Sequence, residues 1–329
     1  MSDLKKAPAL LEVKKLSVEF MPKKNTHLKA VEDVSFSLRE GELLGLVGES
    51  GCGKTTMMLS LLRLLPEAGR ITAGKILYRN QDLLDLEEEQ MRDYRWKEIA
   101  IIFQGAMNAL NPVRTVHDQI AEAITCHELK TPKEKSDKRV SELLELVGIP
   151  ASRGTQYPFQ FSGGMRQRVM IAMALACSPS IVIADEPTTA LDVMIQAQIL
   201  ELLQELSRQL GLAVILVTHD LGVVAEICDK VLVMYGGVTA EYADVDTIYN
   251  QPRHPYTQEL IKAFPDLTKP KKKLSSIPGY PPRLDALPAG CRFAPRCPAA
   301  FSRCLTEQPA LHKISDTHIA SCHLVEAPK

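Results

Sequence analysis

The chain has 329 residues, of which 45% are hydrophobic, so it can bury a full core, and its length suggests about two domains. Its 39 basic and 40 acidic residues leave a formal charge of -1, so no overall field favours nucleic acid or an anionic membrane surface as a partner. No apolar stretch approaches the ~20 residues that cross a bilayer, and the polar N-terminus lacks the features of a secretory signal. We therefore expect a cytosolic chain with reduced thiols.

The N-terminal elements lead into a glycine-rich loop. Apolar and polar residues alternate between Leu10 and Leu38, and this period of two predicts antiparallel strands. The segment 42–47 is a short apolar strand that runs into the loop, and 54–65 has a helical composition until Pro66 stops it. The sequence thus predicts a strand, a glycine loop and a helix in succession.

Strand and helix patterns then alternate. Four further buried strands are predicted, at 99–103, 181–184, 213–217 and 231–234. A long helix is predicted from Val193 to Leu210, with Asp192 as its N-cap and Gly211 as its C-terminal stop. This alternation indicates an α/β sheet in a domain spanning residues 1–250, with a helical subdomain at about 106–178.

The glycine loop has the chemistry of a phosphate-binding loop. Gly48-Glu49-Ser50-Gly51-Cys52-Gly53-Lys54-Thr55 fits the pattern G-x-x-x-x-G-K-[ST], in which backbone N–H groups wrap a phosphate and the lysine reaches the β and γ phosphates. The Thr55 hydroxyl and the Asp185 carboxylate are the expected Mg²⁺ ligands, because the charge of the transferred group must be neutralised in place. The candidate nucleotide-binding residues of this region are Gly48, Ser50, Gly51, Cys52, Gly53, Lys54, Thr55 and Thr56.

Three segments occur in one order along the chain: this loop, then Phe161-Ser162-Gly163-Gly164-Met165, then Ile181-Val182-Ile183-Ala184-Asp185-Glu186. Together they resemble the ATP-binding cassette (ABC) family. The resemblance implies an ABC-type nucleotide-binding domain, with a phosphate-loop core sheet, an antiparallel β subdomain and a helical subdomain.

The resemblance also implies roles for single residues. Glu186 would polarise the attacking water, Gln104 would sense Mg²⁺ and that water, and His219 would be the switch histidine near the γ-phosphate. Phe20, at the end of the first strand pattern, would stack on the adenine ring; a core aromatic is the alternative. The loop containing Asp192 would contact an opposite protomer.

Ser162, Gly163 and Gly164 open a predicted helix whose free N–H groups form an anion site. In the family, this end faces the γ-phosphate bound by a second nucleotide-binding domain. From spacing alone, an N-cap serine followed by two flexible glycines is the alternative. Phe161 and Met165 depart from the commonest family form, which has a glutamine at the fifth position, but the three residues of the anion site are intact.

Four of the eight cysteines crowd the C-terminal region: Cys291, Cys297, Cys304 and Cys322. Proline becomes frequent after about Asn250, so residues 251–329 are predicted to form a small extension with few long regular elements and little apolar material for a core. Four thiolates around a metal centre would stabilise it, and a cytosolic location argues against disulfides. Four cysteines suit a [4Fe–4S] cluster, and zinc is the alternative because spacing does not decide the metal.

Two C-terminal segments, His254-Pro255-Tyr256-Thr257 and Gly290-Cys291-Arg292-Phe293-Ala294-Pro295-Arg296-Cys297-Pro298, resemble the extension of ATPase subunits from bacterial dipeptide and oligopeptide importers. In that subfamily the four cysteines bind a [4Fe–4S] cluster. The resemblance implies an ATP hydrolase that energises import of di- or oligopeptides from the cytoplasmic side of the inner membrane. Its partners would be two membrane-spanning permease subunits, a second ABC ATPase subunit and, through the complex, an extracytoplasmic peptide-binding protein.

Two alternative functions remain at this stage. An importer for nickel or another small solute has ATPases that resemble the peptide class. A soluble ABC ATPase acting on nucleic acid is less favoured, because the segment 106–178 is too short for the long coiled coil of chromosome-type members and the chain shows a single cassette. Binding to nucleic acid is therefore not expected.

Overall fold

The computed structural model describes residues 8–23, 26–105, 109–127, 131–189, 191–263 and 277–325. The chain divides into two compact units. The first unit comprises Met1–Arg39, Leu44–Asp85 and Val217–Lys329, and the second comprises Glu40–Leu43 and Leu86–Leu216. The domain boundary predicted near residue 250 falls inside the first unit and stays a prediction.

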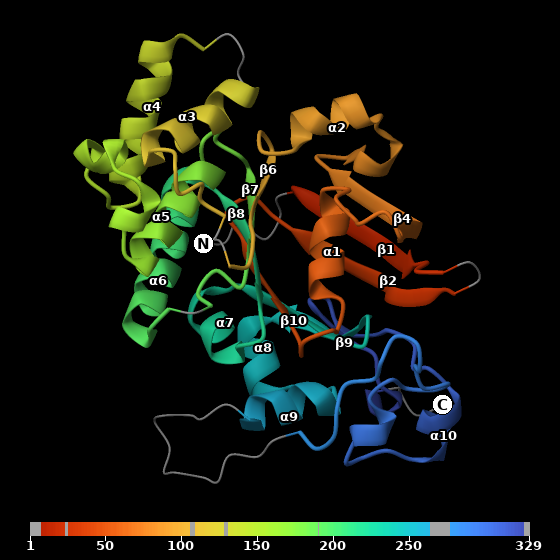
Figure 1. The fold of residues 1–329 in the computed structure, drawn as a ribbon. Helices are drawn as coiled ribbons and strands as arrows, with labels where there is room; N and C mark the ends of the chain where they lie inside the picture. The colour runs from red at the N-terminus through yellow and green to blue at the C-terminus, as the bar shows by residue number, and fades with distance from the viewer. Residues whose placement is uncertain are drawn as a thin grey trace. The chain divides into compact units, whose positions relative to one another are not determined.

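The first unit contains a four-stranded antiparallel sheet (Figure 1). Its strands, in spatial order, are β2 (Leu28–Leu38), β1 (Leu11–Phe20), β4 (Gly69–Tyr78) and β5 (Gln81–Asp82). The pairing of β1 with β2 confirms the antiparallel strands predicted from the alternation of apolar residues. Strand β4 was not predicted, because Ile76 and Tyr78 are the large apolar side chains that it buries and its other positions give no period of two.

A second group of strands in this unit carries the glycine loop. Their order is β11 (His312–Ser315), β12 (His318–Ala320), β10 (Val238–Asp244), β9 (Lys230–Tyr235) and β3 (Leu43–Val47). Strands β3 and β9 are parallel and fully buried, as their continuous apolar runs predict. The helices of the first unit are α1 (Lys54–Leu61), α7 (Leu221–Ile227), α8 (Val245–Asn250), α9 (Pro255–Ala263) and α10 (Ser302–Thr306), with 3₁₀ turns at Leu83–Asp85, Ala294–Arg296 and His323–Val325.

Helix α1 is shorter than predicted. The sequence suggested a helix up to Leu65, stopped by Pro66, but the last helical residue is Leu61. Arg63 adopts a left-handed backbone conformation with φ 53°, and the N–H of Leu64 donates to the carbonyl of Leu59 at 2.9 Å. The backbone has therefore left the helix before the proline is reached.

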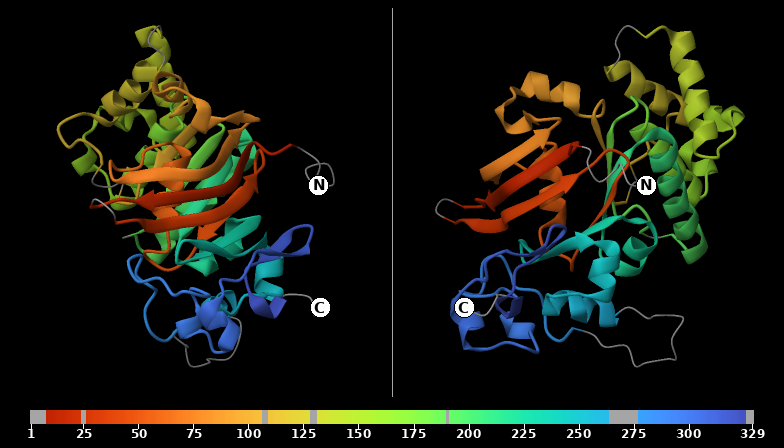
Figure 2. Two further views of the ribbon diagram at one scale, coloured as in Figure 1. Left: turned by 90° about the vertical axis from the view of Figure 1, so that its right-hand side faces the viewer. Right: turned by 180° about the vertical axis from the view of Figure 1, so that it is seen from behind.

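The C-terminal extension joins a sheet of the first unit. Strand β12 pairs with β10, with Ala320 opposite Glu241, and β11 pairs with β12 in turn. Figure 2 shows this segment, in blue, beside the strands and helices that precede it. The regular elements within 277–325 have five residues or fewer, as the proline content predicts, whereas α9 has nine.

The second unit contains three strands and the larger helices. The strands follow the order β8 (Ala213–Thr218), β7 (Ile181–Asp185) and β6 (Ile99–Ile102), and β6 and β7 are parallel. The last two residues of β8, Val217 and Thr218, are counted in the first unit. Its helices are α2 (Glu88–Tyr94), α3 (Val116–His127), α4 (Lys133–Leu146), α5 (Gly163–Ala174) and α6 (Val193–Leu210), with 3₁₀ turns at Ala151–Thr155 and Pro158–Gln160. Helices α3 to α6 pack on one another (Figure 1), and the described residues between 109 and 178 include no strand.

Helix α6 begins and ends where the sequence predicted. The Asp192 carboxylate accepts a hydrogen bond from the N–H of Ile195 at 3.1 Å, and Gly211 ends the helix with φ 66°. Both are local signals, and each acts as expected.

Candidate functional site

The phosphate loop of the first unit connects β3 directly to α1, which begins at Lys54. Gly53 has φ 101°, and a Cβ at this position would lie 2.5 Å from the carbonyl oxygen of Ala30. No other residue type fits there, because both the backbone conformation and the space exclude a side chain. This arrangement confirms the strand, loop and helix that the motif requires.

The Lys54 ammonium lies inside this loop. Its side chain is largely buried, and Nζ donates to the carbonyl oxygens of Gly48 at 2.5 Å and Glu49 at 3.2 Å. A buried cation among backbone dipoles is suited to bind the oxygens of a phosphate group.

The other residues of the loop differ in exposure. Ser50, Gly51 and Thr55 are exposed, and Thr56 is half-buried. Cys52 is buried, and burial raises the pKa of its thiol, so the group is a neutral, small side chain within the loop.

Two more predicted residues belong to the first unit. Phe20 ends β1, is half-buried and pairs with Gly69 of β4. His219 is exposed just after β8, beside Asp220, whose carboxylate caps α7 by accepting from the N–H groups of Gly222 and Val223. Stacking on adenine by Phe20 and phosphate sensing by His219 stay predictions.

In the second unit the structure brings two predicted catalytic residues together. Gln104 Nε2 donates to Glu186 Oε2 at 2.7 Å, and the Thr189 hydroxyl donates to the same oxygen at 3.0 Å. The two side chains come from the ends of β6 and β7, which are parallel neighbours. Glu186 has φ 43°, a conformation that is costly for a non-glycine residue and is found where a functional group must be aimed. Asp185, which precedes it, is buried at the end of β7.

The helix α5 begins at Gly163, with Ser162 as its N-cap. The Ser162 hydroxyl accepts from the N–H of Met165 at 3.4 Å, as the capping alternative predicts. Gly164 also has a packing role, since a Cβ there would lie 2.6 Å from Cγ2 of Ile195 on α6. The helix N-terminus is thus held close to the α6 N-terminus that Asp192 caps.

The two departures from the common family pattern share one neighbour. The guanidinium of Arg153 lies 4.7 Å from the ring centroid of Phe161, and its Nη1 donates to the sulfur of Met165 at 3.2 Å. Both side chains therefore pack locally within the second unit.

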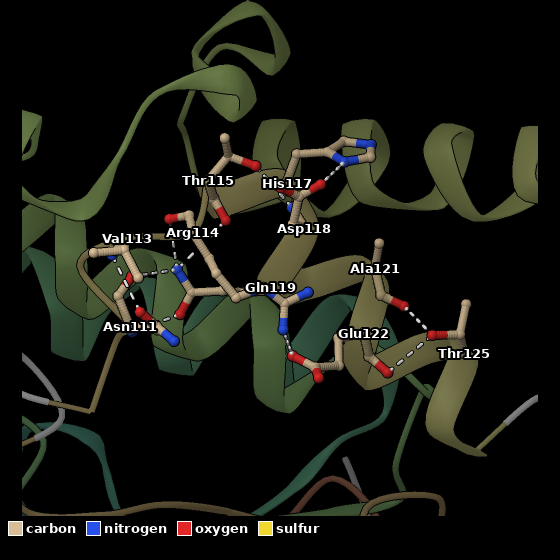
Figure 3. A network of polar contacts seen from close by, with 10 residues as sticks. All are labelled: Asn111, Val113, Arg114, Thr115, His117, Asp118, Gln119, Ala121, Glu122 and Thr125. Atoms are coloured by element: carbon tan, nitrogen blue, oxygen red, sulfur yellow. Dashed lines mark hydrogen bonds and ion pairs between the residues drawn. The ribbon is translucent and has the colours of Figure 1, made fainter.

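A polar network orders the loop before α3 (Figure 3), and no pattern in the sequence predicts this network. Gln119, 5% exposed, accepts from the N–H of Asn111 at 2.8 Å and donates to the carbonyls of Asn111 and Arg114, both at 3.1 Å. The loop that it holds presents Val113, which is 79% exposed. A lone buried glutamine in a helical pattern has no sequence signal that would distinguish it from an exposed one.

The four C-terminal cysteines line one cavity in the first unit, together with His254, Phe293 and His323. Burial raises the pKa of the Cys291 and Cys297 thiols and raises that of Cys322 to about 11, and the neighbouring thiols add to these increases. Within the described ranges, no group of three or more His, Cys, Asp or Glu side chains is arranged so that it could hold a metal ion. The four cysteines thus line the same cavity, but binding of a metal by their thiolates stays a prediction.

The chain belongs to a known family. The family model described as "ABC transporter" matches residues 31–189, and the model described as "Oligopeptide/dipeptide transporter, C-terminal region" matches residues 240–304. The chain is therefore an ABC-type ATPase with the nucleotide-binding α/β fold. Within that class it belongs to the family of dipeptide and oligopeptide transport ATP-binding proteins, as relatives at full length show.

The relatives include the dipeptide transport ATP-binding protein DppD of Escherichia coli (strain K12), which is 48% identical over 317 residues and 96% of each chain. DppD of Bacillus subtilis (strain 168) is 49% identical over 318 residues, which cover 96% of this chain and 94% of that one. The oligopeptide transport ATP-binding protein OppD of the same organism is 47% identical over 326 residues, covering 97% and 90%.

Solved structures support the fold. The dimeric structure of MJ0796, a bacterial ABC transporter cassette, aligns with a TM-score of 0.63 and 28% identity over 71% of this chain and 98% of that chain. A post-hydrolysis state of the same cassette bound to ADP and Pi gives a TM-score of 0.62 at the same identity and coverage. Among the described helices, none has the length and apolar character needed to cross a membrane.

Proposed function

We propose that this chain is the ATP-hydrolysing subunit that energises import of di- or oligopeptides through a membrane ABC transporter. The observation that carries the proposal is the full-length similarity to peptide-transport ATP-binding proteins, which includes the C-terminal region as well as the ATPase domain. The ATPase machinery is common to many transporters, whereas the C-terminal match is to a peptide-transporter model.

Different residues of the chain would bind the nucleotide, hold Mg²⁺ and activate the attacking water. Gly48 to Thr56 would bind the phosphates, with Lys54 on the β and γ oxygens, and Phe20 would stack on the adenine. Bound Mg²⁺, held by Thr55 and Asp185, would neutralise the phosphate charge, with Gln104 close by. Glu186 would accept the proton of the attacking water, and its hydrogen bond from Gln104 would keep its carboxylate oriented.

A second ATPase subunit would complete each site. Ser162, Gly163 and Gly164 at the start of α5 would offer N–H groups that have no partner within the helix to an anion, and they would face the γ-phosphate bound by the opposite protomer. Asp192 would lie in the contacting loop, and His219 would respond to the γ-phosphate. The partner would be a related ATPase or a second copy of this chain.

The complex would place the chain at the cytoplasmic face of the inner membrane as a peripheral subunit. Two membrane-spanning permease subunits would form the path, and an extracytoplasmic peptide-binding protein would deliver the peptide. Closure of the two ATPase subunits on ATP would drive the change in the permeases, and hydrolysis would reset it.

We propose further that Cys291, Cys297, Cys304 and Cys322 bind a [4Fe–4S] cluster. Two observations support it: the four side chains line one cavity, and four thiolates are the usual ligand set of such a cluster. A bound cluster would cross-link an extension that has few apolar residues. Because thiolates are the ligands, binding would release protons from groups whose pKa is raised in the free protein.

The cluster proposal is tested by the iron and acid-labile sulfide content and the visible spectrum of anaerobically purified protein. About four iron and four sulfide per chain are expected, with loss in a Cys297→Ser variant. Stoichiometric zinc without sulfide would show that the site binds zinc and not the cluster. Protein that contains neither iron nor zinc would refute metal binding by this region.

The transport proposal is tested in vesicles that contain the chain with its permeases and binding protein. Uptake of a labelled dipeptide should require ATP and should fail with Glu186→Gln. Uptake of nickel without peptide uptake would make the chain the ATPase of a small-solute importer. ATPase activity of the isolated chain that is stimulated by RNA would overturn the importer proposal.

A further inference from the structure

The C-terminal extension contacts the phosphate loop directly through Arg296. The two terminal nitrogens of its guanidinium donate to the two carboxylate oxygens of Glu49, Nη1 to Oε2 at 2.6 Å and Nη2 to Oε1 at 3.0 Å. The Arg296 side chain is 5% exposed and that of Glu49 27%. A two-point contact of this kind fixes both distance and orientation, which a lysine would not do.

The rest of the Arg296 guanidinium is also occupied within the first unit. Its Nε donates to the carbonyl of Pro278 at 2.8 Å, and Nη1 also donates to the hydroxyl of Tyr235 at 3.2 Å. A buried cation with this many fixed acceptors has a defined position, so it can define the position of Glu49 in turn.

A second contact holds the same loop residue by its backbone. The N–H of Glu49 donates to the hydroxyl of Tyr256 at 3.0 Å, and Tyr256 is fully buried. Its ring packs against Tyr235 and Phe293, with centroids 4.6 and 5.3 Å away. The hydroxyl is thereby fixed, and the N–H of Glu49 is bonded to it and so is not offered to a phosphate.

A third contact reaches the loop through a turn. Arg292 donates to the carbonyl of Gly236, and the N–H of the next residue, Gly237, donates to the carbonyl of Cys52 at 2.9 Å. Arg292 and Arg296 each adjoin a cysteine of the extension, Cys291 and Cys297. Two links thus join the segment 291–297 to the loop, and Tyr256 of α9 adds a third.

The contacts of Glu49 offset the negative charge that this residue brings to the phosphate loop. A glutamate in a loop that binds a polyanion would repel the ligand and would compete with it for Lys54. Pairing with a buried arginine neutralises that carboxylate and keeps it in one place. The alternative is an ion pair that only attaches the extension to the rest of the unit. That alternative does not explain why the two-point contact is made to a residue of the phosphate loop.

We propose that Arg296 and Tyr256 are positioning residues of the ATP site, through which the C-terminal extension sets the affinity of the phosphate loop for a nucleoside triphosphate. The proposal rests on the proposed ATP-binding function of the loop. Arg296 acts by neutralising and orienting Glu49, and Tyr256 acts by holding the Glu49 backbone.

The test measures binding of a fluorescent ATP analogue with Mg²⁺ to the full chain. Arg296→Gln should weaken binding by about tenfold or more, because the half-buried carboxylate of Glu49 is left beside the phosphate site without its cationic partner. Glu49→Gln in the same chain should restore most of the affinity, since the unpaired charge is then gone. Arg303→Gln, which removes an exposed ion pair with Glu307 in the same extension, is the matched control and should bind like the unaltered chain.

Thermal unfolding of each variant separates positioning from folding. If Arg296→Gln does not fold, the Tyr256→Phe variant tests the proposal in its place. It keeps the packed ring, so it should fold, and it loses the hydroxyl that holds Glu49, so it should still bind the analogue more weakly. Two results would overturn the proposal: an unchanged affinity for the analogue in the folded variants, or a reduced affinity in Arg296→Gln that Glu49→Gln does not restore. Failure of the unaltered chain to bind the analogue would instead overturn the ATP site itself.

Discussion

Replacing Gln119 with leucine is expected to release the loop that precedes α3. The glutamine side chain makes one hydrogen bond as acceptor and donates to the carbonyls of Asn111 and Arg114, all at 3.1 Å or less (Figure 3). Leucine has a similar volume, so the loss is mainly polar. At about 0.5–1.5 kcal/mol for each hydrogen bond, the three sum to about 1.5–4.5 kcal/mol.

This loss should appear as local opening more than as global unfolding. The bonds fasten a surface loop to a helix whose apolar face, including Val116 and Ile120, stays buried. A cost of 2 kcal/mol corresponds to a roughly 30-fold increase in the open population. Hydrogen exchange of the amides in 109–115 should accelerate by about that factor, while the unfolding midpoint falls less.

A matched control is the ion pair that joins Arg114 of the same loop to Glu122 of α3. Glu122→Gln removes the exposed ion pair between Glu122 and Arg114, which should be worth less than about 1 kcal/mol. If Gln119→Leu leaves exchange in the loop unchanged, or if Glu122→Gln accelerates it equally, the reasoning is refuted.

Three further predictions concern single side chains. Glu186→Gln should lower the rate of phosphate release by about 10²–10⁴-fold and leave nucleotide binding intact, since the amide cannot accept the proton of water; equal loss of binding would contradict this role. Gly164→Ala should destabilise the protein by about 1–3 kcal/mol in chemical unfolding, and Ile195→Ala should relieve that change because it removes the methyl group 2.6 Å from the new Cβ; strict additivity would argue against the contact. Burial lowers the pKa of His254 from 6.5 to about 4, so the unfolded chain binds more protons between those values and stability falls as the pH drops through that range. His254→Gln should flatten this decline, measured as the urea midpoint at about pH 7 and about pH 5, and an unchanged slope would exclude His254 as its source.

The parts of the fold that the sequence predicted well are those with local causes. The ends of α6 follow from Asp192 and Gly211, and the buried strands β7, β8 and β9 follow from short apolar runs. The phosphate loop follows from a motif whose residues are adjacent in sequence. In each case the residues that make the interaction lie within a few positions of one another.

Strand β4 shows why other parts escaped prediction. It passes a bulge in β1, where Lys15 has φ 48° and the pairing register shifts between Lys14 and Ser17. Gly74 faces this bulge, and a Cβ there would lie 2.6 Å from the Cα of Leu16. The glycine that weakens the strand pattern is thus required by a partner strand about 60 residues away, which no local pattern reports.

The candidate site divides in the same way. The roles of Glu186 and Gln104 were implied by the family resemblance and by their places after apolar strands. Their hydrogen bond, however, depends on two parallel strands lying side by side. Arg296 and Glu49 are separated by 247 positions, and their charges are individually unremarkable in the sequence. Long-range ion pairs of this kind are decided by tertiary packing, so the link between the extension and the loop had to come from the structure.

The link between Arg296 and Glu49 must act in both directions. If the extension raises the affinity of the loop for nucleotide, then nucleotide must stabilise the paired state of the extension by the same free energy. An ATP analogue with Mg²⁺ should therefore slow hydrogen exchange in the segment 291–297 of the unaltered chain and of Arg303→Gln. In Arg296→Gln, measured at a nucleotide concentration that saturates the variant, this protection should disappear. Protection that persists there would mean that nucleotide reaches the extension by a route other than the Arg296–Glu49 pair.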